Sequence, residues 1–242
     1  YKLTIKTSVG LTQYINDNTG SYKFEEFEYG QYYVSIQALG NNNNLLSSNA
    51  SDFITIEKLS VPTLTFDKST HKFKTDDENV KIYIKNLVTG ETIDHDFVSN
   101  EFTFNENAGI YEVYAVKMAR EKNQIDSEKS NTIHIKKLPT ITNLKHKVVD
   151  GYSYLDFVSV SGCEGYQVLI DDVTVQYSKQ LLDGKEILKL LLPTDELFSE
   201  AKNYEIKVIG FDNSFSNQGL NYFVLSEDAK SNILNVVRLS SP

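Results

Sequence analysis

The sequence predicts an all-β protein built from tandem two-layer β-sandwiches, the first of which is incomplete. Two observations lead to this prediction. A short pattern occurs three times along the chain, and apolar residues alternate with polar ones in several segments between its copies. Alternation with period two is typical of a sheet with one buried face. A recurring unit indicates an array of similar domains and not one large catalytic fold.

Each copy of the pattern reads Ser, then Asp or Asn, then an alternating apolar strand, then a basic residue and Leu. The three copies are Ser51–Leu59, Ser130–Leu138 and Ser231–Leu239. The last Leu of the second copy follows that of the first after 79 residues, and the third follows after 101. The third unit is therefore longer, and its extra residues fall around 179–201 and 211–230.

Two other strands keep their places within the units. An early strand alternates at Tyr1-Leu3-Ile5, Val80-Ile82-Ile84 and Tyr166-Val168-Ile170, and a later strand at Tyr32-Val34-Ile36-Ala38, Tyr111-Val113-Ala115 and Tyr204-Ile206-Val208-Gly210. Pro62 and Pro139 follow the first two copies of the pattern and cannot continue a sheet ladder. We therefore expect three units at 1–60, 61–138 and 139–242, joined by linkers too short for free swing.

The first unit lacks its first two strands. Unit two has room for both strands between Pro62 and Val80, whereas Tyr1 already lies in the strand that follows them. An incomplete sandwich exposes an apolar face and open edges, so either the missing strands were cut away or another segment supplies them. The chain starts with Tyr1 and not Met, and we expect it to belong to a longer protein.

The third unit contains one further strand and a helical turn. Leu188, Leu190 and Leu192 alternate and predict a core strand that ends at Pro193. Residues 194–201 follow with Thr and acidic side chains, which favour the start of a single helical turn.

Residues Phe157–Tyr166, which read FVSVSGCEGY, resemble the stretch W-x-P-V-x-G-A-x-G-Y of fibronectin type III domains. Phe157 stands where that family usually has Trp, and Cys163 where it usually has Ala. The strand Tyr32–Ala38 is similar to the family's Y-x-V-x-V-x-A strand, and the Ser-Asn pairs are similar to those before its last strand. Unit two shows no clear aromatic-to-Gly-Tyr segment between Phe66 and Val80.

This resemblance implies a seven-stranded Greek-key sandwich of the immunoglobulin-like type in each complete unit, with two sheets packed face to face. It also implies a tyrosine corner, in which a Tyr early in the sixth strand anchors a turn through its hydroxyl. Tyr32, Tyr111 and Tyr204 match that position.

Composition excludes several classes of partner. The net charge is −9, from 24 basic and 33 acidic residues, which argues against nucleic-acid binding and gives no basic surface for anionic lipid. No apolar run approaches the roughly 20 residues that cross a bilayer, so we expect no membrane insertion within these residues. Cys163 is the only cysteine and cannot form an intrachain disulfide. A cysteine-poor chain rich in Asn and Lys fits an extracellular bacterial protein, secreted or attached to the cell surface.

Candidate catalytic or metal-ligating residues have simpler explanations. Cys163 has no His nearby in sequence and takes the place of a small core residue, so we interpret it as core and not as a nucleophile. In Asp94-His95-Asp96 the two carboxylates face one way on a strand and the imidazole the other, which does not suit one ion. Asp76-Asp77-Glu78 and Asp171-Asp172 are typical of solvated turns. We expect no enzyme activity, cofactor or metal.

One segment is a candidate binding loop. Residues Phe211–Phe223 are longer than their counterparts and mix aromatics with Asn, Ser and Gly, a composition that suits adaptable contacts and stacking on sugar rings. The candidate binding residues are Phe215, Asn217, Asn221, Tyr222 and Phe223. The alternative is that Leu220, Tyr222 and Phe223 pack onto the edge of the domain.

Two functions of different classes remain open. The first is a non-catalytic spacer or adhesion region of a larger bacterial surface or secreted protein, which positions neighbouring domains of the same polypeptide and contacts an extracellular glycan or protein. The second is a set of accessory modules of a secreted polysaccharide-degrading enzyme whose catalytic domain lies outside these 242 residues. The sequence flanking this chain in its parent gene separates the two.

Overall fold

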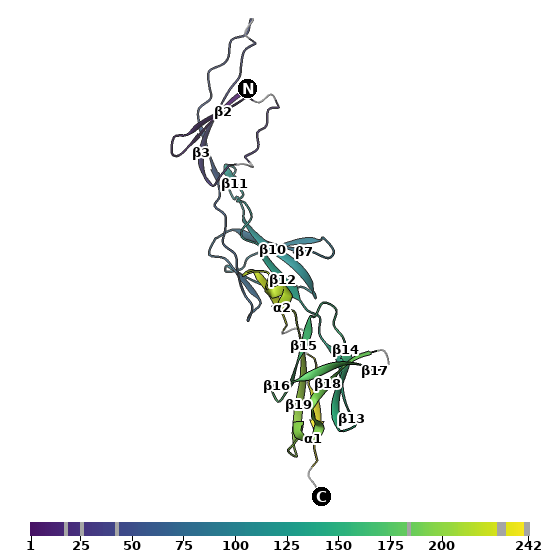
Figure 1. Ribbon diagram of the computed structural model, residues 1–242. Coiled ribbons are helices and arrows are strands. Elements are labelled where there is room, and N and C mark those ends of the chain that lie inside the picture. Colours follow the sequence, from purple (N-terminus) through teal and green to yellow (C-terminus); the bar gives the residue numbers. More distant parts are fainter. Residues whose placement is uncertain (17–18, 25–26, 42–43, 183–184, 227–230, 240–242) are drawn as a thin grey trace. The chain divides into compact units, whose positions relative to one another are not determined.

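The structure is a computed structural model, and it describes residues 1–16, 19–24, 27–41, 44–182, 185–226 and 231–239 (Figure 1). Its regular elements are strands, apart from two helices of four residues each among the described residues. The chain divides into two compact units, which differ from the three predicted units at 1–60, 61–138 and 139–242; the latter are called the first, second and third repeats from here on. Unit 1 comprises residues 1–85, 92–104 and 113–132, and unit 2 comprises residues 86–91, 105–112 and 133–242. The predicted all-β class is confirmed.

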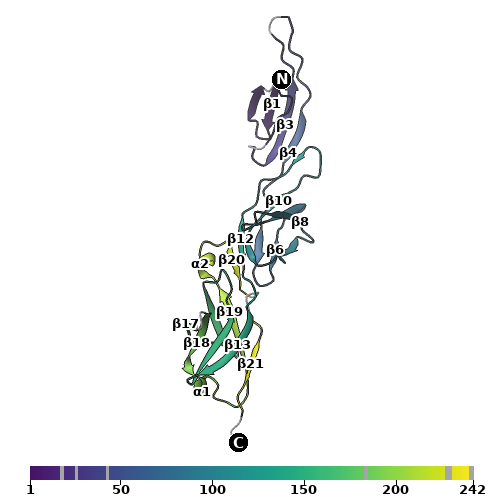
Figure 2. The ribbon, with the colours of Figure 1, turned by 90° about the vertical axis from the view of Figure 1, so that its right-hand side faces the viewer.

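The N-terminal part of unit 1 is a five-stranded sheet with the order β11-β4-β3-β1-β2. Figure 2 shows β1, β3 and β4 within this sheet. Its strands are β1 (Lys2–Thr7), β2 (Thr12–Asn16), β3 (Gly30–Gln37), β4 (Ile54–Lys58) and β11 (Gln124–Ile125). The first four pair antiparallel, whereas β11 pairs parallel with β4. The predicted alternation places Ile5, Tyr32 and Val34 in the buried core of this sheet.

One face of this sheet is covered by an aromatic cluster and not by a second sheet, within the residues that the structure describes. Tyr22, Phe24 and Phe27 come from the connection between β2 and β3 and pack against the buried residues of the sheet. The ring of Phe27 meets that of Tyr32 edge-on at a centroid distance of 5.0 Å. The first sandwich is therefore incomplete, as predicted, and its own connection partly shields the apolar face.

The next strands form a three-stranded sheet and part of a five-stranded one. The three-stranded sheet has the order β5-β6-β9, with β5 (Thr65–Asp67), β6 (Lys72–Lys74) and β9 (Glu101–Thr103). The larger sheet has the order β20-β12-β10-β7-β8. Its strands are β7 (Val80–Asn86), β8 (Thr92–Asp96), β10 (Gly109–Lys117), β12 (Ile133–Lys137) and β20 (Tyr222–Leu225).

Unit 2 contains a complete two-layer sandwich. One sheet has the order β13-β14-β18-β17 and the other β16-β15-β19-β21. The strands are β13 (Thr142–Val149), β14 (Tyr152–Val158), β15 (Gly165–Ile170), β16 (Val173–Val175), β17 (Tyr177–Leu182), β18 (Lys185–Pro193), β19 (Asn203–Phe211) and β21 (Leu234–Val237). If the three-residue edge strand β16 is left out of the count, the first, second, fifth and fourth strands form one layer, and the third, sixth and seventh form the other. This is the immunoglobulin-like and fibronectin type III-like arrangement.

The core of this sandwich lies where the two layers meet. Leu155 on one sheet and Val168, Ile206 and Val208 on the other have no solvent exposure. Residues of the predicted family segment join them, because Phe157 meets Tyr166 edge-on at a centroid distance of 4.8 Å. The Phe that replaces the usual Trp therefore packs in the core.

The three predicted tyrosine corners are present. The hydroxyl of Tyr32 donates to the carbonyl oxygen of Glu28 at 2.6 Å, that of Tyr111 to Asn107 at 2.9 Å, and that of Tyr204 to Glu200 at 3.1 Å. Each bond therefore spans four residues. The recurring pattern is also uniform, because Ser51, Ser130 and Ser231 each accept, through Oγ, a backbone N–H of the strand that carries the corner tyrosine, which is β3, β10 or β19.

The prediction of one core residue, Leu192, is wrong. Leu188 and Leu190 are buried as expected, but Leu192 is 50% exposed, and Ile187 is buried instead. Tyr152 pairs with Pro193 and Tyr154 with Lys189, so β18 has extra residues opposite β14. Such an irregularity shifts the alternation of side chains between the two faces. The predicted helical turn follows directly as α1 (Thr194–Leu197).

Candidate functional site

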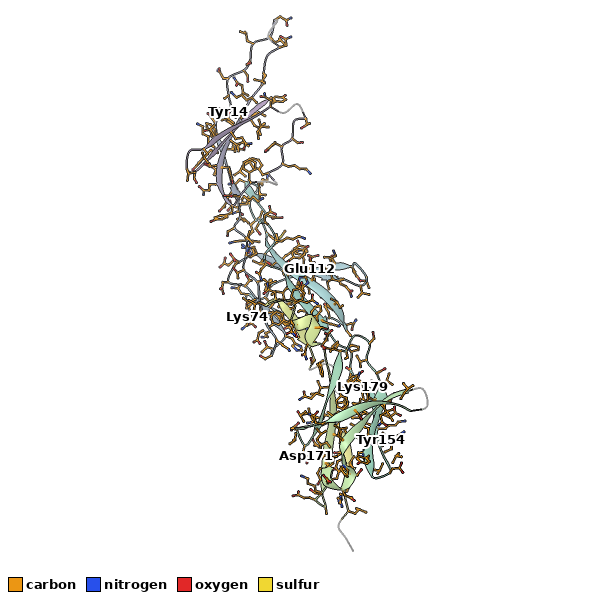
Figure 3. All side chains as sticks on the ribbon, viewed as in Figure 1. Tyr14, Lys74, Glu112, Tyr154, Asp171 and Lys179 are labelled. Atoms are coloured by element: carbon orange, nitrogen blue, oxygen red, sulfur yellow. The ribbon has the colours of Figure 1, made fainter. Side chains whose placement is uncertain are left out.

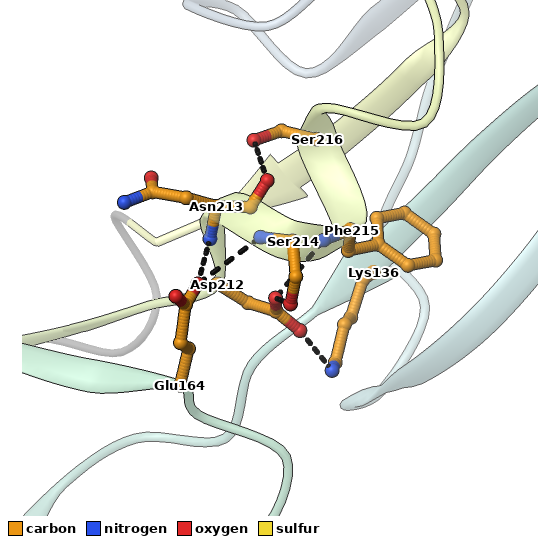
Figure 4. Close-up of polar contacts among 7 residues, drawn as sticks. All are labelled: Lys136, Glu164, Asp212, Asn213, Ser214, Phe215 and Ser216. Carbon is orange, nitrogen blue, oxygen red and sulfur yellow. Dashed lines mark hydrogen bonds and ion pairs between the residues drawn. The ribbon is translucent and has the colours of Figure 1, made fainter.

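The predicted binding loop divides into a short helix and a strand. Helix α2 (Asn213–Ser216) follows β19, and β20 follows after a turn. All of these elements belong to unit 2. Figure 4 shows the polar contacts that hold α2.

Two carboxylates hold the first turn of α2. Asp212 is its N-cap and accepts the backbone N–H of Phe215 at 3.0 Å and the hydroxyl of Ser214 at 2.7 Å. One oxygen of Glu164 accepts the backbone N–H groups of Asn213 at 2.7 Å and Ser214 at 3.0 Å (Figure 4). Asp is a preferred N-cap because its oxygen satisfies an otherwise free donor of the first turn. The helix therefore has a fixed position despite its length.

Asp212 also forms an ion pair with Lys136 of β12 (Figure 4). Both side chains are largely buried, with 7% of Asp212 and 15% of Lys136 exposed. Burial raises the pKa of Asp212, but its hydrogen bonds with Lys136, Ser214 and the N–H of Phe215 outweigh this effect, and the pKa lies below its ordinary value. The carboxylate is therefore ionised at neutral pH and ties α2 to β12.

The aromatic residues of the loop pack on β12. Strand β20 runs parallel to β12, with Tyr222 opposite His134 and Phe223 opposite Ile135. The ring of Tyr222 stacks on that of His134 at a centroid distance of 4.4 Å and meets Phe215 edge-on at 5.4 Å. All three predicted aromatic binding residues are thus partly buried by contacts within the molecule.

The two predicted asparagines remain exposed. Asn217 caps the C-terminus of α2, where its N–H donates to the carbonyl oxygen of Asn213. The carbonyl oxygen of Asn221 accepts the N–H of His134 at 2.8 Å, which leaves its side chain in solvent. Leu220 is 98% exposed between them. The surface that this loop offers to a ligand therefore includes Asn217, Leu220 and Asn221, next to the exposed Asn213, Ser214, Gln218 and Gly219, and Leu220 was not among the predicted binding residues.

Unit 1 has an apolar groove that the sequence did not place. It has a volume of about 550 Å³ beside the aromatic cluster of the first sheet. Its lining includes Tyr1, Leu3, Tyr22, Phe24 and Ile54. The absence of the first two strands from the first repeat is the feature of the sequence that could have predicted this groove. A sheet without its partner layer leaves apolar side chains uncovered.

Cys163 packs between two apolar clusters. It contacts the core of the sandwich and a smaller cluster formed by Leu138, Val224 and Phe215. Burial raises the pKa of its thiol, so the thiol is protonated at neutral pH. These contacts agree with the interpretation of Cys163 as a small core residue.

The acidic turns and the Asp-His-Asp segment make contacts with neighbouring side chains. Asp77 pairs with Lys117 at 3.0 Å, Asp171 with Lys202 at 3.0 Å and Asp172 with Lys207 at 3.0 Å. Asp94 pairs with Lys81, and His95 stacks on Phe102 at a centroid distance of 4.8 Å. Among the described residues, no group of three or more His, Cys, Asp or Glu side chains could hold a metal ion.

Comparison with known proteins gives a likeness to solved structures. No family model matches the sequence, and no curated protein matches it. A solved structure of the FN1–FN3 domains of chicken CNTN1 is similar, with a TM-score of 0.27 and 14% sequence identity, over 99% of this chain and 89% of that one. No helix in the described part of the chain has the length and hydrophobicity to span a membrane.

Proposed function

We propose that this chain is a non-catalytic spacer or adhesion region of a larger bacterial cell-surface or secreted protein. It positions neighbouring domains of the same polypeptide and contacts an extracellular glycan or protein. The observation that supports the spacer role is a strand pairing that occurs twice. In unit 1, β11 adds to the last strand of the first repeat, and in unit 2, β20 adds to the last strand of the second repeat.

The pairing in unit 1 combines main-chain and side-chain bonds. The N–H of Glu57 donates to the carbonyl oxygen of Asn123 at 2.9 Å, and that of Leu59 to Ile125 at 3.0 Å. The amide of Gln124 donates to the carboxylate of Glu57 at 2.9 Å. Bending at this point would break these bonds, so they stiffen the connection between the first two repeats.

The pairing in unit 2 is longer. Four residue pairs join β12 and β20, from His134 with Tyr222 to Lys137 with Leu225. Leu225 has no solvent exposure, and Val224 is 3% exposed. Apolar burial and the Lys136–Asp212 ion pair thus add to the main-chain bonds. A spacer needs connections that hold a fixed geometry, and strand addition supplies them.

Distance measurements between spin labels test the spacer role. Gln13 and Thr92 are exposed and lie in the first and second repeats, and each can be replaced by Cys for labelling in a Cys163→Ala background. We expect a narrow distance distribution. The matched variant Glu57→Pro lacks the N–H that donates to Asn123 and should broaden the distribution. A distribution that is already as broad without this substitution would contradict a stiff spacer.

Glycan arrays test the adhesion role. Asn217, Leu220 and Asn221 are exposed beside a helix that two carboxylates hold in place, so they form the surface to vary. Loss of a glycan signal in Asn217→Ala with Asn221→Ala, and its retention in Thr174→Ala on an exposed strand elsewhere, would support this surface. Identical glycan-binding profiles of this double variant and the unchanged protein would contradict a binding role for this surface. Binding confined to plant or bacterial polysaccharides would favour the accessory-module function.

A further inference from the structure

The two strand pairings have the same register relative to the recurring pattern. In unit 1, Ile125 lies opposite Lys58, which precedes the last Leu of its copy. In unit 2, Leu225 lies opposite Lys137, which holds the same place in the second copy. An apolar residue from the following repeat is therefore paired with the basic residue each time. The last Leu is covered in both copies, because Leu59 is 9% and Leu138 1% exposed.

The third copy of the pattern has the same edge, and no strand among the described residues pairs with it. Strand β21 is the edge strand of its sheet, and Val237, Arg238 and Leu239 take the places of Glu57, Lys58 and Leu59. The N–H of Arg238 donates inward to the carbonyl oxygen of Lys202 at 3.0 Å. Because N–H groups alternate along a strand, those of Val237 and Leu239 point outward, as in the first copy. Leu239 is 83% exposed.

The first repeat contains a loop that corresponds to β11 and its surroundings. Counting back 79 residues places Asn44, Leu45 and Leu46 where Asn123, Gln124 and Ile125 stand in the second repeat. Leu45 is 63% exposed and Leu46 97% exposed. We call residues Asn44–Leu46 the leucine arm.

The base of the leucine arm has the same hydrogen bonds as the base of β11. The hydroxyl of Ser48 accepts the N–H of Ala38 at 3.0 Å, as that of Ser127 accepts the N–H of Lys117 at 2.9 Å. The hydroxyl of Ser47 accepts the N–H of Gly40 at 3.0 Å. At the corresponding positions of the second repeat, the carboxylate of Asp126 accepts the N–H of Ala119. The correspondence is therefore one of structure and not only of sequence spacing.

The arm is held in place before any partner arrives. The side-chain oxygen of Asn41 accepts the backbone N–H groups of Asn44 at 3.2 Å and Leu45 at 3.0 Å. The backbone also passes close to Gly40, where a Cβ would lie 2.1 Å from the carbonyl oxygen of Leu45. Such a preformed segment loses little conformational entropy on binding.

We propose that the leucine arm docks as a parallel strand on the last strand of another β-sandwich of this repeat type. The partner in this proposal is a second copy of this chain, and the arm pairs with the edge of its strand β21. The common register places Leu45 opposite Val237 and Leu46 opposite Arg238. The arm covers Leu239 of the partner and loses its own exposure, as in the two pairings within the chain. Strand addition of this kind joins molecules head to tail.

Disulfide trapping tests this register. Leu45→Cys and Val237→Cys are made separately in a Cys163→Ala background and mixed at high concentration in a glutathione buffer. Opposed residues of neighbouring strands lie about 4.8 Å apart, within the range that a disulfide spans. In unit 1 the corresponding side chains, Gln124 and Glu57, touch at 2.9 Å. We expect the peptide that links positions 45 and 237 to dominate.

The matched control is Val173→Cys, on the opposite edge of the same sheet. Val173 is 65% exposed and Val237 is 63% exposed, so random collisions should trap both equally. Mass spectrometry should find at least tenfold more of the 45–237 link than of the 45–173 link. Equal yields would overturn the proposal.

A second comparison separates docking from general stickiness. Leu46→Ser added to Leu45→Cys should lower the yield of the 45–237 link about tenfold. Leu220→Ser is the control, because Leu220 is 98% exposed and Leu46 97% exposed, but Leu220 lies outside the arm. An unchanged yield with Leu46→Ser would overturn the proposal. Circular dichroism of each variant verifies that the fold is intact.

Discussion

The ammonium group of Lys58 lies 2.6 Å from the carboxylate of Glu128, seventy residues later in the chain. Lys58 is the basic residue of the first copy of the recurring pattern, and only 3% of its side chain is exposed. Its ammonium group also donates to the carbonyl oxygen of Phe24 at 3.3 Å. Alternation alone would assign Lys58 only to the end of a strand. In the structure it carries a buried charge at the junction between the first and second repeats.

Removing the acid should cost more than removing the base. Glu128→Gln replaces the carboxylate that pairs with the buried ammonium of Lys58 by a neutral amide, which weakens the compensation of a buried charge, and we expect a loss of about 2–3 kcal/mol in the free energy of unfolding. Lys58→Met removes the charge and keeps an unbranched side chain of similar length, so we expect a smaller loss. Urea denaturation of the two variants measures the difference, and a larger loss for Lys58→Met would contradict the argument.

Removing the hydroxyl of Tyr204 should destabilise the sandwich of unit 2. This hydroxyl donates to the carbonyl oxygen of Glu200 at 3.1 Å and accepts the N–H of the same residue at 2.8 Å. Tyr204→Phe leaves both groups without this partner, and we expect a loss of about 1–3 kcal/mol. Tyr14→Phe is the control, because Tyr14 is a 64% exposed side chain of β2 (Figure 3). Equal thermal midpoints for the two variants would exclude a structural role for the corner.

The contribution of Asp212 to stability should depend on pH. Its pKa is lower in the folded protein than its ordinary value. Its contribution is therefore complete above the unfolded pKa of about 4 and is lost as the pH falls through the folded pKa. Asp212→Asn should lower stability by about 3 kcal/mol at pH 7, since Lys136 is largely buried. The difference in stability between the two proteins should shrink as the pH falls below about 4. A difference that is constant between pH 7 and pH 2 would contradict this assignment.

Adding a methyl group at Gly165 should disturb the sandwich. Gly165 pairs with Phe211 across β15 and β19, and a Cβ there would lie 2.7 Å from the ring of Phe211. We expect Gly165→Ala to cost about 1–3 kcal/mol, because the ring must move. In the double variant with Phe211→Leu the added cost of Gly165→Ala should shrink. Additive losses in a double-mutant cycle would show that the ring is not the cause.

Most strands could be predicted because their signals are local. The alternation of β3, β10 and β19 follows from the pleat, which sends successive side chains to opposite faces. The same reasoning failed at Leu192, because the irregular pairing between β14 and β18 depends on both strands and not on either sequence alone. A binding role for the candidate loop stays a prediction, and the packing of its Tyr222 on His134 could not be foreseen, because it depends on a strand 88 residues earlier in the chain.

The sequence by itself determined the β class, the recurring last strand and the tyrosine corners, because each depends on residues within a few positions of one another. Only the tertiary structure decided which edges are paired. Parallel addition of β11 to β4 and of β20 to β12 joins segments remote in sequence through main-chain groups, which every residue except proline carries alike. Such bonds leave no residue signature, so the partner of an edge strand is known only when its neighbour in space is known.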